Sequence, residues 1–147
     1  GGYGFAGRDE SGNQKWYPQV VEGSTAVYGD DGSVFIVYAG SGYWTPYYAL
    51  GQLTLHGDPE RIEDWKKEKE PIFSMSDKVF GCGHASFFKD AAGDRFICYH
   101  AYLSREKGAK RYVFLERYRI EDGKIIIGDG SGKPADYTVT TETITIF

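Results

Sequence analysis

The chain has 147 residues with a formal net charge of −4, and 41% of its residues are apolar. This length suffices for one domain with a core, and the apolar content excludes a disordered chain. The lysines and arginines form no basic block, and no apolar run approaches the roughly 20 residues that cross a bilayer. We therefore expect neither nucleic acid nor a membrane among the partners.

The first half of the chain predicts four short strands joined by turns. Asp-Gly within "DDG" at 30–32 separates two β-branched runs, which is a strong signal for a hairpin. "GDPERIEDW" reads as a single helical turn, with Asp58 as its cap and Pro59 at its first position. The predicted strands are "STAVYG" at 24–29, "SVFIVYAG" at 33–40, "YYALGQLTL" at 47–55 and "EPIF" at 70–73.

The second half repeats this pattern. "DAAGD" and "EDG" provide the turns of two further hairpins, and the tail "DYTVTTETITIF" at 136–147 can add one or two strands. The hairpin strands are "HASFFK" at 84–89, "RFICYHAYL" at 95–103, "RYVFLERYRI" at 111–120 and "KIIIG" at 124–128.

Four antiparallel strands recurring about every 50 residues are typical of β-propeller blades. We therefore predict an all-β protein with a single domain over 1–147. It is a partial β-propeller of about two four-stranded blades, at about 20–74 and 82–128, with extra terminal strands at 136–147.

Several ordered motifs resemble one enzyme family. In chain order they are "VVEGS" at 20–24, "VFIVYAGSGYWTPYYALG" at 34–51, "GDP" and "PIF" within 57–73, "GCGHASF" at 81–87, "ICYHAY" at 97–102, and an Arg-Tyr strand ending in "EDGK". From about Trp16 to Lys124 the chain resembles glycoside hydrolase family 43. The resemblance implies a five-bladed β-propeller enzyme that acts on arabinose- and xylose-containing polysaccharides.

Glu22 matches the general acid of that family, although Ser24 replaces the proline of the family motif. A glycosidic oxygen is a poor leaving group until it is protonated, and a carboxyl group in poorly solvated surroundings keeps its proton more tightly. The resemblance therefore implies that Glu22 is the proton donor. The alternative is that the strand has not yet begun and Glu22 points into water.

His84 matches a family histidine near the propeller axis, often beside a bound cation, with Cys82 in place of the motif's proline. The resemblance implies that His84 contacts substrate or a structural cation such as calcium, with no cofactor required. If the hairpin turn centres on Ala92, His84 faces His100 across the ladder. The alternative is a hydrogen-bonded pair of core histidines without an ion, because two histidines are too few to hold zinc.

Arg111 matches a family arginine that contacts substrate, and a planar cation can hold sugar hydroxyls and a carboxylate. Its alternative is a surface ion pair with Glu106 or Glu116. Tyr43 and Trp44 lie in a loop where their rings could stack on sugars, although aromatic residues in a β protein are more often core.

Hydrolysis in this family needs a base and a third carboxylate besides the acid. Asp9 is the sole aspartate before Glu22, and it lies in a polar turn, "GRDESGN". We therefore predict a glycosidase fragment that is inactive alone or nearly so and binds arabinose- or xylose-containing oligosaccharides. The alternative is a non-catalytic carbohydrate-binding or assembly module. Exposed sheet edges also predict a homo-oligomer, or pairing with a separately encoded N-terminal half.

Overall fold

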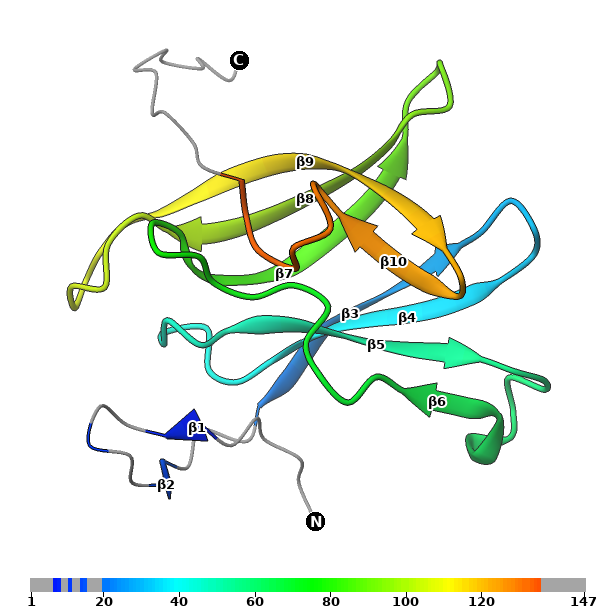
Figure 1. The fold of residues 1–147 in the computed structure, drawn as a ribbon, viewed down its shortest axis with the longest axis horizontal. Coiled ribbons are helices and arrows are strands. Elements are labelled where there is room, and N and C mark those ends of the chain that lie inside the picture. Colours follow the sequence, from blue (N-terminus) through cyan, green and yellow to red (C-terminus); the bar gives the residue numbers. More distant parts are fainter. Residues whose placement is uncertain (1–6, 9–10, 12–13, 16–19, 136–147) are drawn as a thin grey trace.

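The computed structural model describes residues 7–8, 11, 14–15 and 20–135. Its first described elements are a short pair of antiparallel strands, β1 (Gly7–Arg8) and β2 (Gln14–Lys15). Two four-stranded antiparallel sheets follow, one after the other along the chain (Figure 1). No helix among the described residues is both long and apolar enough to cross a membrane.

The first sheet is a meander in which each strand pairs with the next one in sequence. Alternating buried positions along its second strand, at Phe35, Val37 and Ala39, place one face of the sheet against the core. The strands are β3 (Val21–Tyr28), β4 (Val34–Gly40), β5 (Ala49–Leu55) and β6 (Trp65–Lys67), with a 3₁₀ turn, η1 (Ile62–Asp64), before the last.

The second sheet repeats the meander with β7 (Phe80–Lys89), β8 (Arg95–Tyr102), β9 (Arg111–Glu121) and β10 (Lys124–Ile127). Asp122 and Gly123 connect β9 to β10, and both have positive φ, at 48° and 72°. Two consecutive positive φ angles are the requirement of a type I′ hairpin turn, which "EDGK" satisfies. The predicted all-β fold with two blade-like sheets is confirmed, whereas the predicted terminal strands at 136–147 lie outside the described residues.

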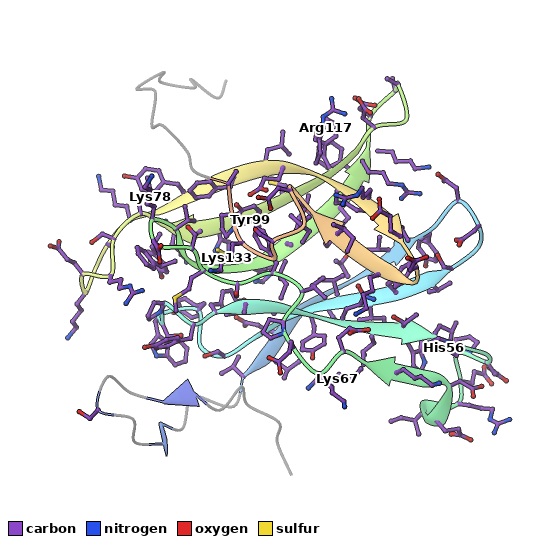
Figure 2. All side chains as sticks on the ribbon, in the orientation of Figure 1. His56, Lys67, Lys78, Tyr99, Arg117 and Lys133 are labelled. Carbon is purple, nitrogen blue, oxygen red and sulfur yellow. The ribbon has the colours of Figure 1, made fainter. Side chains whose placement is uncertain are left out.

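One core lies between the two sheets. Strand β7 contacts β3, β4 and β5, so the first strand of the second sheet packs across the first sheet. Phe35 and Leu50 of the first sheet and Ile97 of the second are fully buried, and Tyr99, labelled in Figure 2, is almost fully buried in the same cluster. Each such side chain contributes about 1.5–3 kcal/mol on burial, so this interface holds the two sheets together.

A buried glutamine also joins the two sheets. Gln52 of β5 is fully buried, and its Nε2 donates to the carbonyl oxygen of Gly123 at 3.1 Å. Its Oε1 accepts a hydrogen bond from the backbone N–H of Ile125 at 3.0 Å. Gln52 therefore ties β5 to the β9–β10 turn at the end of the interface.

The fourth strand of the first sheet differs from its prediction. The strand expected at 70–73 forms a single bridge between Phe73 and Leu50, whereas Trp65–Lys67 pairs with β5. Pro71 lacks the N–H that a ladder needs, which keeps that segment from continuing as a strand. The helical turn begins later than predicted, because η1 covers Ile62–Asp64 with Arg61 at its N-cap, so the prediction of Asp58 as its cap and Pro59 at its first position is wrong. The Oδ1 of Asp58 instead accepts from the backbone N–H of Glu60 at 2.9 Å, in the turn just before η1.

Candidate functional site

Glu22 lies at the start of β3, where the strand is irregular. It pairs with Ala39, and the ladder shifts register between Glu22 and Thr25. Gly23, inside this bulge, has a φ of +58°, and a Cβ there would lie 3.1 Å from the ring of His84. Glycine thus allows the bulged backbone to approach the second sheet closely. The side chain of Glu22 is half-buried rather than fully exposed.

Tyr48 holds the carboxylate of Glu22. Its hydroxyl donates to Glu22 Oε1 at 2.7 Å, and its side chain is fully buried just before β5. Burial raises the pKa of Tyr48, and the nearby Glu22 raises it further, so the phenol keeps its proton and remains a donor. Gly83 of β7 packs against this ring so closely that any side chain there would overlap it.

Two histidines of the second sheet lie beside this pair. The expectation that His84 faces His100 directly is wrong, because β-bulges on either side of Gly83 shift the register and His100 pairs with Gly83. The two rings nevertheless remain neighbours, with centroids 5.9 Å apart. The ring of His100 also stacks on Tyr48, with centroids 6.2 Å apart and planes 15° from parallel.

The surroundings of His100 favour its neutral form. Burial lowers its pKa from 6.5, and the positive charge of Arg111 and the proximity of His84 lower it further, while Glu22 opposes them. Its Nδ1 is buried and has no hydrogen-bond partner among the described residues. Solvent does not reach this nitrogen, so a ligand or water could contact it only if the surrounding side chains moved.

The predicted cation near His84 finds few ligands in the described part of the chain. Within it, no group of three or more His, Cys, Asp or Glu side chains lies close enough to hold a metal. Calcium prefers six to eight oxygen ligands, and the two imidazoles supply none. The calcium ion stays a prediction, and a cation here would depend on water or on oxygen atoms beyond this cluster.

The loop that carries Tyr43 and Trp44 contacts the cluster of Glu22, Tyr48 and the two histidines through Arg111. The guanidinium of Arg111 lies over the ring of Tyr43 at 5.0 Å, and that ring meets Trp44 edge-on at 5.0 Å. Tyr43 and Trp44 are 44% and 58% exposed, so both present ring surface to solvent. Glu116 instead accepts a hydrogen bond from Tyr99 in the core, and the described ion pairs contain none between Arg111 and either proposed partner.

The structure therefore brings all five predicted site residues to one end of the molecule. The β4–β5 loop, the start of β7 and the β8–β9 connection lie on the left of Figure 1, and the start of β3 lies below them, nearer the middle. Sequence reasoning did not assign Tyr48 its contact with Glu22. The signal available for it was Gly83, since a glycine inside a strand often marks a close approach by another group.

The arrangement combines one carboxyl group with several groups that suit a sugar. A half-buried carboxyl can donate a proton, imidazole and guanidinium groups bind hydroxyls, and exposed rings stack on sugar faces. Glu22 is the one carboxylate whose charge acts on both Tyr48 and His100 in the described chain. The cluster thus contains a candidate proton donor without a second carboxylate at its side.

Comparison with known protein families gives a match over most of the chain. The model for "Glycosyl hydrolases family 43" matches residues 8–125. No curated protein is significantly similar to the chain.

Solved structures share the fold. A thermostable family-43 glycoside hydrolase is 25% identical with a TM-score of 0.65, over 82% of this chain and 39% of its own. An endo-1,4-β-xylanase from Bacteroides thetaiotaomicron is 23% identical with a TM-score of 0.64, over 74% of this chain and 38% of its own. A xylan β-1,4-xylosidase from Bacillus halodurans is 20% identical with a TM-score of 0.62, over 87% of this chain and 26% of its own. The chain thus spans well under half the length of each.

Proposed function

Because the chain belongs to glycosyl hydrolase family 43, we propose that it supplies the proton-donating side of a glycosidase site for xylose- or arabinose-containing polysaccharides. The observation that carries this proposal is the hydrogen bond from Tyr48 to Glu22, formed where two histidines and Arg111 converge. This bond fixes the direction of the carboxyl group. A donor must be oriented toward the glycosidic oxygen to protonate it as the bond breaks.

Catalysis by this cluster alone is not expected. An inverting glycosidase needs two carboxyl groups roughly 6.5–9.5 Å apart, one as acid and one to activate water. Among the described residues, Glu22 is the one carboxyl group of the cluster, and it is the candidate for the acid. We therefore expect the 147-residue chain to hydrolyse aryl xylosides and aryl arabinofuranosides little or not at all.

The assay compares the chain with Glu22→Gln, which keeps the size of the side chain and removes the acid. Absence of turnover by both proteins is the expected result. Robust turnover that Glu22→Gln abolishes would contradict the predicted inactivity of the chain and would support Glu22 as the proton donor. The base would then come from a second copy or from another part of the protein. Turnover that survives Glu22→Gln would remove Glu22 from the mechanism.

Sugar binding is the consequence of this proposal that is easier to measure. We expect xylo- or arabino-oligosaccharides to stack on Trp44 and Tyr43 and to reach Arg111. Calorimetric titration should show Trp44→Ala weakening this binding several-fold, since ring stacking contributes about 0.5–1.5 kcal/mol. Tyr28→Ala is a matched control, because Tyr28 is also an exposed aromatic residue but lies at the opposite end of β3.

A non-catalytic carbohydrate-binding or assembly module is the second candidate. The exposed aromatic pair beside a single carboxylate favours it, since binding needs the rings and not the acid. It predicts that Glu22→Gln leaves oligosaccharide affinity unchanged while Trp44→Ala weakens it. An affinity that depends on Glu22 more than on Trp44 would speak against this candidate.

The exposed apolar side chains support association with another chain. Val21 is 63% exposed on the first sheet, and Val113, which points away from the core because its neighbour Phe114 is buried, is 76% exposed on the second. We therefore expect self-association, or pairing with a separately encoded N-terminal half. Light scattering tests the first, and a strictly monomeric mass over a wide concentration range would rule it out.

A further inference from the structure

A cavity adjoins the candidate site. It has a volume of about 430 Å³ and lies between the β4–β5 loop and the β8–β9 loop, within the range of small-molecule sites, about 300–1,000 Å³. Its apolar wall consists of Trp44, Pro46, Phe80 and Tyr102, and its charged residues are Arg105, Glu106 and Lys107. The cavity lining therefore has two cationic side chains, one anionic side chain and three aromatic rings.

Arg105 lines this cavity, is exposed to solvent and has no carboxylate partner among the described residues. Its guanidinium lies 4.6 Å from the centre of the Phe80 ring, and its Nη2 lies 4.0 Å from the sulfur of Met75. Among the arginines of residues 20–135, Arg105 and Arg111 are those with no ion pair to a described residue. The other four are paired as Arg61–Glu63, Arg95–Asp30, Arg117–Asp94 and Arg119–Glu121.

The cavity and the candidate site share a wall. Tyr102, which lines the cavity, pairs directly with Arg111 in the ladder, and its hydroxyl donates to the carbonyl oxygen of Tyr43 at 3.1 Å. Trp44 belongs to the cavity lining and also contacts the ring of Tyr43. A polymer bound over these rings would carry its nearest branches to the cavity.

A guanidinium without an anionic partner, held against a ring, is suited to binding a carboxylate through two parallel hydrogen bonds. The aromatic wall is suited to the apolar face of a sugar ring. We propose that this cavity binds a carboxylated sugar, a uronosyl branch of the polysaccharide, with Arg105 holding its carboxylate and Lys107 adding positive charge. The inference rests on the proposed function, because the neighbouring cluster must hold the polymer's main chain.

The test compares two xylo-oligosaccharides of equal length, one unbranched and one with a single glucuronosyl branch, by calorimetric titration at low salt. We expect about tenfold tighter binding of the branched acid, because hydrogen bonds to charged groups are the stronger kind. Arg105→Gln should abolish this preference and leave the affinity for the unbranched sugar unchanged. Arg61→Gln, an arginine with an exposed ion pair in the β5–β6 connection, is the control that should preserve both affinities.

A third ligand, with a neutral glucosyl branch, separates charge from size. It should bind no better than the unbranched sugar if the carboxylate is what Arg105 recognises. Equal affinity for all three ligands, or a preference for the acid that survives Arg105→Gln, would overturn the inference and leave the proposed function standing. Failure of every ligand to bind would contradict both, and far-ultraviolet circular dichroism confirms that each variant is folded.

Discussion

The hydrogen bond between Tyr48 and Glu22 should stabilise the fold measurably. Tyr48→Phe removes only the hydroxyl, which donates to Glu22 Oε1 at 2.7 Å from a fully buried side chain. Hydrogen bonds to charged groups contribute about 1.5–3 kcal/mol. Because Glu22 is half-buried, water can replace part of the lost bond, so we expect a loss of about 1–2 kcal/mol in the free energy of unfolding.

A double-mutant cycle measures that contact. Urea unfolding of the parent chain, Tyr48→Phe, Glu22→Ala and the double variant should give a coupling energy of about 1 kcal/mol between the two sites. Tyr112→Phe, on a half-exposed tyrosine of β9, is the control and should change the unfolding free energy by less than about 0.5 kcal/mol. A coupling energy below about 0.3 kcal/mol would refute the argument, because the two side chains would then contribute independently.

Three further predictions concern other buried polar groups. Tyr38→Phe should raise the unfolding free energy by about 1 kcal/mol, because the Tyr38 hydroxyl is buried without a hydrogen-bond partner in the described chain; a loss in urea unfolding would contradict this. Gln52→Leu should lower it by about 2–4 kcal/mol, since the Gly123 carbonyl and the Ile125 N–H lose their partner; a loss below about 1 kcal/mol would show that water replaces the side chain. Because burial lowers the pKa of His100, the unfolded chain takes up a proton at higher pH than the folded chain, so stability should fall as pH drops through about 6.5. Urea unfolding at several pH values should show this fall in stability, and His100→Asn should make the fall smaller. If stability falls as steeply with pH in the variant as in the parent chain, the fall comes from other titrating groups.

The strands and their order were predictable because local rules agreed with the tertiary structure. The continuous apolar run within 33–40 matches β4, whose residues are mostly buried, and the Asp-Gly turns have the short connections that a meander needs. The fourth strand was not predictable in the same way. Trp65–Lys67 contains two lysines and shows no alternation of apolar and polar residues. It forms a strand because β5 offers it a free edge.

The sequence could single out residues that the structure brings together, but not their geometry. The motif around His84 identified the histidine, whereas its pairing with His100 failed because the bulges in β7 are absent from any simple count of residues across a hairpin. Tyr48 lies within the strand predicted at 47–55, and no role in the site was predicted for it. Its contact with Glu22 depends on how the start of β3 and the residue before β5 are placed across the first sheet, and Gly83 was the one local signal of a close approach.

The cluster draws its parts from both sheets, so its geometry depends on how the sheets pack rather than on either ladder. Glu22 and Tyr48 come from the first sheet, whereas His84, His100 and Arg111 come from the second. The backbone hydrogen bonds within each sheet would survive a small separation of the two, but the contacts between rings and carboxylate would not. The buried residues between the sheets therefore support the site as well as the fold, and a core substitution can weaken ligand binding without removing any group that touches the ligand.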